Sequence, residues 1–244
     1  MSIELNGSSI SPTISEIYLG IYISSDMSWQ QYIYGEKWRN KDNYPGLIPI
    51  VNSRLGMLNK LSKFASREKM KIMVDGIVLS KLRYNLGIIG KIWIKSPYRD
   101  NEVRYRTFTK KDNQRLQVTM NKALKMALGK KIKNYPTADL LRESGKLSIH
   151  QETAYQVGIQ VKKIMKIQKP ASLSIKFKQR DTRNTRNQRY VTRDTRLVIT
   201  QESFVNQGIN LLNQIPPEIL AIEKNERFKR EYRKWVLTKI PIKP

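Results

Sequence analysis

Apolar residues recur every three or four positions along most of this sequence, which is the spacing of one face of a helix. The pattern is clearest between Leu116 and Gly129, and similar stripes cover Leu47–Leu61 and the residues after Ser66 and Ser148. Serine is a favoured N-cap, and glycine is favoured just beyond a helix C-terminus. These signals predict several helices with defined ends, and so a mainly α protein.

Two β-rich runs, residues 3–7 and 16–23, stand before the helices. They predict a small β-hairpin or two paired strands. We expect this N-terminal β-hairpin to pack on a helical bundle, with an extended basic arm before the last helix. The expected segments are a hairpin with a first helix at 1–35, a helical pair at 46–95, a helical domain at 113–168, the basic arm at 169–200 and a C-terminal helical segment at 201–244.

Positive charge is in large excess. The 244 residues include 46 Lys and Arg but 20 Asp and Glu, a formal net charge of +26. Such an excess opposes a compact state by self-repulsion unless a polyanion is bound. The expected partner is therefore nucleic acid, as RNA or an RNA/DNA duplex, and a ribonucleoprotein particle is a further expectation.

The excess is concentrated between Lys162 and Arg196, where twelve Lys and Arg face two acids. Arginine recurs every third residue there among short polar residues, which predicts a loop or extended arm. Guanidinium groups bind phosphates in a bidentate way, and arginine-rich arms can fold onto RNA. A solvated linker is the alternative. The candidate contacts of the arm are Arg180, Arg183, Arg186, Arg189, Arg193 and Arg196.

Lys130, Lys131 and Lys133 follow the helix that ends at Gly129. They are candidates either for phosphate contact or for complementing the dipole of that helix. Four aromatic residues are candidates for stacking on bases, with core packing as the alternative. These are Trp93, Tyr98, Tyr105 and Tyr190.

Several chemistries are excluded by residue counts. There is no cysteine, so disulfides, zinc fingers and thiolate catalysis are excluded. The one histidine, His150, is expected to lie on the surface at a helix start. The eight aspartates are scattered and no two acids are adjacent, so we expect no catalytic residues, no metal site and no cofactor.

No signal or transit peptide is recognised at the N-terminus, and the apolar stretch 77–94 is interrupted by Lys81, Arg83 and Lys91. A membrane-spanning helix needs about 20 apolar residues. We therefore expect an intracellular protein, nuclear or cytoplasmic, that does not enter a membrane. Its oligomeric state stays open.

Four motifs occur in an order that resembles non-LTR retrotransposon reverse transcriptases, in the part that follows the catalytic palm. The first combines residues 3–7 with Tyr18-Leu19-Gly20-Ile21 and the segment Asp26–Ile33. The helix Lys69–Trp93 is similar to the family's thumb helix, and Leu116–Gly129 to the helix after it. The last motif is Asn213–Pro217 followed by Phe228-Lys229.

The resemblance implies a primer-grip hairpin at Tyr18, Leu19 and Gly20, followed by a thumb-like helical pair and C-terminal helices. It also implies that the palm aspartates are absent, so that the chain holds nucleic acid without polymerising it. A polymerase fragment, a decayed copy and a domesticated protein are all compatible with this. The two alternatives to such a binding protein are a structural RNA-binding subunit of a ribonucleoprotein, such as a ribosome-associated protein, and a fragment of an active RNA-directed DNA polymerase.

Overall fold

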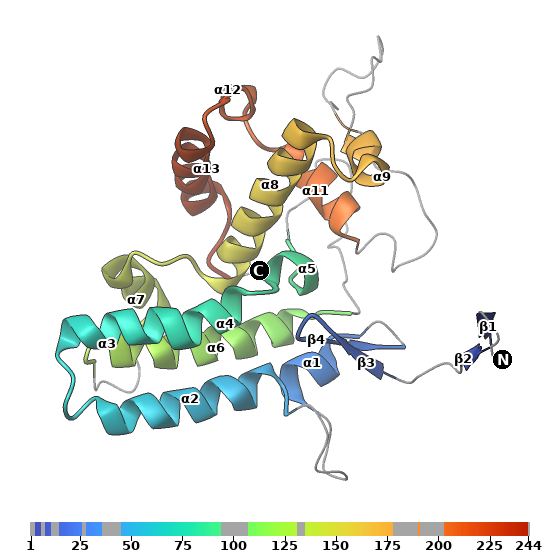
Figure 1. The fold of residues 1–244 in the computed structure, drawn as a ribbon. Coiled ribbons are helices and arrows are strands. Elements are labelled where there is room, and N and C mark those ends of the chain that lie inside the picture. Colours follow the sequence, from blue (N-terminus) through green and yellow to red (C-terminus); the bar gives the residue numbers. More distant parts are fainter. Residues whose placement is uncertain are drawn as a thin grey trace.

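The fold is mainly α, as the sequence predicts. The computed structural model describes residues 3–5, 8–10, 15–25, 28–35, 45–93, 107–130, 135–177, 190 and 203–243 (Figure 1). The strands are β1 (Ile3–Leu5), β2 (Ser8–Ile10), β3 (Ser15–Tyr18) and β4 (Ile21–Ser24). The helices before residue 130 are α1 (Gln30–Tyr34), α2 (Leu47–Leu61), α3 (Arg67–Met73), η1 (Val74–Leu79), α4 (Ser80–Arg83), α5 (Leu86–Ile89) and α6 (Lys110–Ala127). The later helices are α7 (Thr137–Ser144), α8 (Ile149–Ile167), α9 (Ala171–Ser174), η2 (Ile175–Phe177), α11 (Phe204–Leu212), α12 (Pro217–Leu220) and α13 (Asn225–Lys239).

The N-terminal strands form two hairpins. β1 pairs antiparallel with β2, and β3 pairs antiparallel with β4, so the expected pairing of run 3–7 with run 16–23 is wrong. The reason is a two-residue turn inside the second run, at Leu19 and Gly20, which both have positive φ. Such a turn matches the twist of a tight hairpin and folds the run back on itself.

α2, α3 and α6 pack side by side and enclose the first hydrophobic cluster (Figure 1). α2 contributes the buried side chains of Val51, Leu55 and Leu58 to it. Ser66 caps α3 by accepting a hydrogen bond from the Lys69 amide, as its position predicts. The cap turns the chain back after α2 and sets the two helices antiparallel.

The helix expected over Lys69–Trp93 is not continuous. Its middle part, η1, is a π-helix, and the chain leaves the helical conformation at Asn85, with φ −119° and ψ 10°. A π-helix has a wider turn than an α-helix and is frequently found at functional sites. Beyond α5 the chain runs extended from Gly90 to Trp93.

α6 begins earlier than the sequence suggests. The sequence predicts a helical domain that starts at residue 113, but Thr109 and Asp112 form a capping box, so the helix starts at Lys110. In this box Asp stands where Glu or Gln is usual, so its sequence signal is weaker. The end at Gly129 is confirmed, because this glycine has φ 64° and its amide donates to the Met126 carbonyl.

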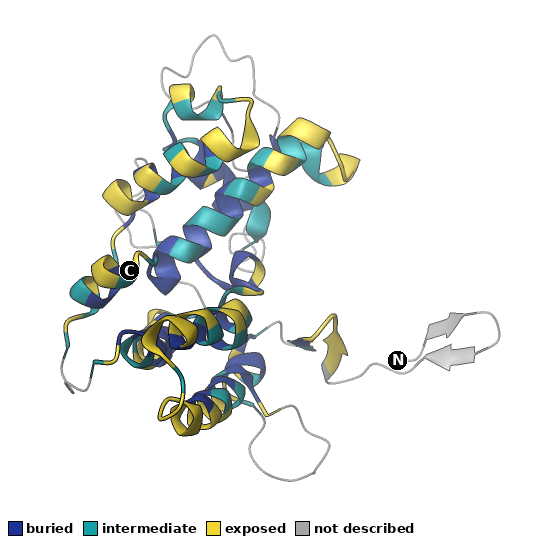
Figure 2. Cartoon of the chain, turned by 60° about the vertical axis from the view of Figure 1, so that its left-hand side comes forward, coloured by how far each residue is buried: buried dark blue, intermediate teal, exposed yellow. Residues whose placement is uncertain are grey.

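α8, α11 and α13 enclose the second hydrophobic cluster, and Figure 2 shows these helices buried where they face one another. Ser148 and Gln151 form the predicted capping box at the start of α8. Phe228, Tyr232, Trp235 and Leu237, at i, i+4, i+7 and i+9, predict an apolar stripe on the last helix, and the first three are buried. Leu237 is exposed, so this part of the prediction is wrong, and Val236 is buried in its place, because a helix turns about 100° per residue.

His150 joins three segments and is fully buried, so the expected surface position is wrong. Its Nε2 accepts a hydrogen bond from the Trp93 amide at 3.0 Å, and its Nδ1 lies 3.0 Å from the Pro241 carbonyl oxygen. The side chain of the neighbouring Gln151 likewise donates from Nε2 to the Ile240 carbonyl oxygen at 2.9 Å. The start of α8 therefore fixes both the extended segment 90–93 and the C-terminal residues, and these cover the imidazole.

Candidate nucleic-acid interface

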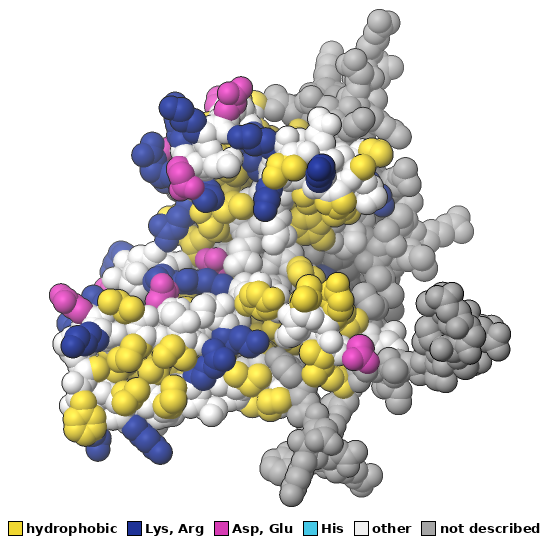
Figure 3. Space-filling model, viewed as in Figure 1, with side chains coloured by type: hydrophobic (Ala, Val, Ile, Leu, Met, Phe, Trp, Pro, Cys, Tyr) yellow, Lys and Arg dark blue, Asp and Glu magenta, His cyan; other side chains and the backbone are white. Residues whose placement is uncertain are grey.

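The C-terminal end of α8 is strongly cationic. It carries Lys162, Lys163 and Lys166, and Lys169 follows two residues after the helix. Lys163, Lys166 and Lys169 are exposed, whereas Lys162 is half-buried. In Figure 3, Lys and Arg side chains gather over this upper part of the molecule, where α8, α12 and α13 lie. These four lysines belong to the cationic stretch Lys162–Arg196 but are not among the contacts predicted from the sequence, although their spacing near a helix end is a sequence signal.

Lys162 and Lys166 are paired with backbone carbonyls. Lys162 Nζ donates to the Leu220 carbonyl and lies 5.5 Å from the centre of the Phe228 ring. Lys166 Nζ donates to the Glu223 carbonyl oxygen at 3.2 Å. Burial lowers the pKa of Lys162, and repulsion by Lys166 lowers this pKa further. A phosphate between the two ammonium groups would relieve this repulsion.

The predicted arm is attached to the second hydrophobic cluster at its two ends and at one point between them. Residues 171–177, in the first part of the arm, form α9 and η2 and are not extended. Phe177 is buried there and meets Phe204, after the arm, edge to face at 6.2 Å. Between them, Tyr190 is 6% exposed. Its amide donates to Asn213 Oδ1 at 3.0 Å, and its carbonyl accepts from Asn213 Nδ2 at 2.9 Å. The arm expected as one stretch is thus divided by a fixed residue.

The six arginines of the arm, together with Lys131 and Lys133, lie outside the described residues. So do two of the four candidate stacking residues, Tyr98 and Tyr105. Tyr190 and Trp93 follow the alternative of core packing. Tyr190 belongs to the second cluster, and the half-buried Trp93 lies 6.1 Å from the Phe108 ring and 5.6 Å from His150.

Lys130 is engaged with a carboxylate. Its Nζ lies 3.0 Å from Glu143 Oε2 and 4.9 Å from the centre of the Tyr135 ring. The hydrogen bond to Glu143 raises the pKa of Lys130, and Tyr135 raises it further. Tyr135 also donates a hydrogen bond to Glu143. A phosphate at Lys130 would have to displace Glu143.

The primer-grip-like residues form the exposed tip of the β3–β4 hairpin. Tyr18 is 64% and Leu19 71% exposed, so they do not pack as in an ordinary strand. Tyr84 Oη donates to the Leu19 carbonyl at 3.3 Å, which ties the tip to the end of α4. Nothing lies within 4 Å of a Cβ placed on Gly20, whose φ is 75°. The positive φ of the turn therefore favours glycine here, and no other segment of the described residues approaches Gly20 closely.

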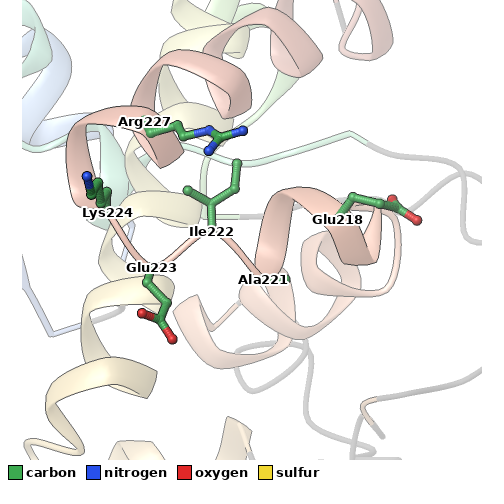
Figure 4. A pocket seen from close by; sticks show the side chains of 6 residues that line it. All are labelled: Glu218, Ala221, Ile222, Glu223, Lys224 and Arg227. Atoms are coloured by element: carbon green, nitrogen blue, oxygen red, sulfur yellow. The ribbon is translucent and has the colours of Figure 1, made fainter.

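A shallow pocket of about 350 Å³ lies between α12 and the start of α13 (Figure 4). Its lining combines acidic, basic and apolar side chains, namely Glu218, Ala221, Ile222, Glu223, Lys224 and Arg227. Figure 4 shows Arg227 above Ile222, while the two carboxylates point in different directions. These side chains do not converge on one point as a built ligand site requires.

Within the described ranges, no three His, Asp or Glu side chains gather so as to hold a metal ion. In the same ranges, no helix is both long and apolar enough to cross a bilayer. Comparison of the chain with models of known protein families, with curated proteins and with solved structures finds no match.

Proposed function

We propose that this chain binds nucleic acid through phosphate contacts, without catalysing a reaction on it. The lysines of α8 and the arginines of the arm form the main contact surface in this proposal. The observation that carries it is the pairing of Lys162 and Lys166 with carbonyl groups, in a chain of net charge +26. On the neighbouring α13, by contrast, lysines form ion pairs with carboxylates, as Lys229 does with Glu226.

The position of the arm supports the same surface. The arm, at 169–200, lies in the sequence between α8 and α11. α8 and α11 pack directly on one another. In this proposal the arginines of the arm and the α8 lysines contact the same polyanion.

The proposal is tested by anisotropy titrations with three labelled probes. These are a 20-nucleotide RNA, a DNA duplex of the same sequence and the corresponding RNA/DNA hybrid. We expect affinity to fall steeply with salt, because each neutralised phosphate releases counterions. A triple variant, Lys163→Gln, Lys166→Gln and Lys169→Gln, should reduce the slope of log K against log salt by about 2 to 3 for B-DNA. The matched control removes the same charge around the α2–α3 turn, as Lys60→Gln, Lys63→Gln and Lys71→Gln.

A flat salt response of the unmodified chain, or equal loss in the two triple variants, would contradict the proposed surface. Changing all six arm arginines to lysine separates charge from bidentate contact, because lysine keeps the charge but not the planar fork. We expect a clear loss of affinity in this variant. Primer extension with magnesium should show no nucleotide incorporation, and measurable incorporation would refute the non-catalytic part of the proposal.

A further inference from the structure

The antiparallel pair formed by α2 and α3 with η1 has two different faces. One face is buried against α6, through residues such as Leu58 of α2 and Val74 of η1. The opposite face exposes large apolar side chains where polar ones are usual. Met57 is 50%, Leu61 43%, Phe64 88% and Ile72 73% exposed. Figure 3 shows apolar side chains gathered over the lower left of the molecule, where α2 and α3 lie.

This exposed face has the pattern of a helix-packing surface. Met57 and Leu61 are four residues apart on one side of α2, and Phe64 follows in the turn after that helix. Ile72 and Gly76 provide the facing positions on α3 and η1. A Cβ on Gly76 would have nothing within 4 Å, so a partner helix can approach the backbone there. Scattered apolar residues on a surface are ordinary, but a contiguous stripe on two adjacent helices marks an interaction site.

The π-helix gives this face a second unusual feature. Arg54, on the same side of α2, donates from Nη1 to the Ile77 carbonyl oxygen of η1 at 2.6 Å. This contact crosses the space between the two helices and fixes their spacing on the open face. A π-helix is often found at functional sites, and here η1 directly follows α3, the helix that carries Ile72.

Charge around the stripe indicates what can cover it. Lys60, Lys63, Lys69 and Lys71 are exposed around it, with Glu68 as the acid among them. A second copy of the chain in a two-fold arrangement would bring lysines against lysines. A helix with an apolar face flanked by Asp or Glu would instead find complementary charge on both sides.

We propose that the open face of α2 and α3 with η1 binds an amphipathic helix of another protein, whose apolar side is flanked by acidic residues. Such a helix would add a fourth member to the layer formed by α2, α3 and α6, in the helix-in-groove mode of recognition. Phe64 and Ile72, the most exposed apolar side chains of the face, would become buried on binding.

A display library of 20-residue helical peptides, randomised on one face and its flanks, tests the proposal on the full chain. We expect selection to enrich apolar residues at helical spacing with Asp or Glu beside them. Selected peptides, measured by anisotropy, should bind Phe64→Glu and Ile72→Glu at least 10-fold more weakly than the unmodified chain. The matched control is Leu237→Glu, which alters an exposed leucine on α13 and should leave affinity unchanged.

Circular dichroism should show all three variants folded, because the replaced side chains are exposed. Peptides that bind equally to Phe64→Glu, or selection without acidic flanks, would overturn the proposal. Three further outcomes would also overturn it, by giving the face to another occupant. The first is a dimer that sedimentation equilibrium detects in the unmodified chain but not in Ile72→Glu. The second is co-sedimentation with phosphatidylserine vesicles that Phe64→Glu abolishes. The third is displacement of the peptide by a short RNA duplex.

Discussion

His150 should make the stability of this protein fall between pH 6.5 and pH 4. The Trp93 amide donates to Nε2, so the ring proton must be on Nδ1, where it is donated to the Pro241 carbonyl. Protonation would place a second N–H at Nε2, directed at the Trp93 N–H. Burial, as the largest cause, lowers the pKa of His150 from 6.5 to about 4.

The magnitude follows from the difference in pKa between the two states. The unfolded chain takes up a proton near pH 6.5 and the folded chain near pH 4. Between these values the unfolded state binds more protons, so the free energy of unfolding falls as the pH falls. At about 1.4 kcal/mol per pKa unit, the total loss approaches about 3 kcal/mol. The contribution of His150 is complete above pH 6.5 and is lost on acidification through this range.

Urea unfolding at pH 7.5, 6.0 and 5.0, followed by circular dichroism, measures this effect. His150 is the only histidine, and carboxylates such as Asp75, whose pKa is lowered by Lys146 and Arg83 against the effect of burial, respond at lower pH. His150→Gln keeps an acceptor for the Trp93 amide without titrating, so its stability should be nearly constant from pH 7.5 to pH 5.0. An NMR titration that places the pKa of folded His150 near 6.5, or an equal slope in the variant, would refute the reasoning.

Two further predictions concern close packing and the attachment of the arm. A Cβ on Gly158 would collide with the Tyr232 ring, so Gly158→Ala should destabilise the fold by about 1 to 3 kcal/mol in urea unfolding, whereas Gly56→Ala, at an open position of α2, should stabilise it by about 0.5 to 1 kcal/mol. Equal effects of the two changes would show that the α8–α13 contact is not tight. Asn213→Ala removes both hydrogen bonds to Tyr190 and should cost about 1 to 3 kcal/mol, with loss of amide exchange protection at Tyr190, whereas the exposed Asn59→Ala should have little effect on either measurement.

The helix ends were predictable because their signals are local. Ser66 and Ser148 each bond an amide three residues away, and Gly129 needs only its own positive φ. His150 could not be placed in this way. Its partners Trp93 and Pro241 lie 57 and 91 residues away in the sequence, and a single imidazole carries no signal of which backbone groups will cover it.

In the candidate interface, too, local features could be predicted from the sequence and long-range contacts could not. The net charge and the lysines near the end of α8 were visible in the sequence, but the partners of individual cations were not. Lys130 and Lys166 are both lysines near a helix C-terminus, yet one meets the Glu143 carboxylate and the other the Glu223 backbone carbonyl. Similarly, the π-helix of η1 lies within a stripe that predicts an ordinary helix, because the period of apolar residues does not separate the two forms over six residues.

The two proposed binding surfaces share no residues, and this has a thermodynamic consequence. The α8 lysines border the second hydrophobic cluster, whereas α2, α3 and η1 enclose the first. A ligand that binds only the folded state at 100 times its Kd stabilises it by about 2.7 kcal/mol. If the surfaces are independent, the effects of an RNA and a docked helix on the free energy of unfolding add. If the two ligands compete, the α2–α3 face belongs to the nucleic-acid interface, and the helix partner is excluded while phosphate binding is retained.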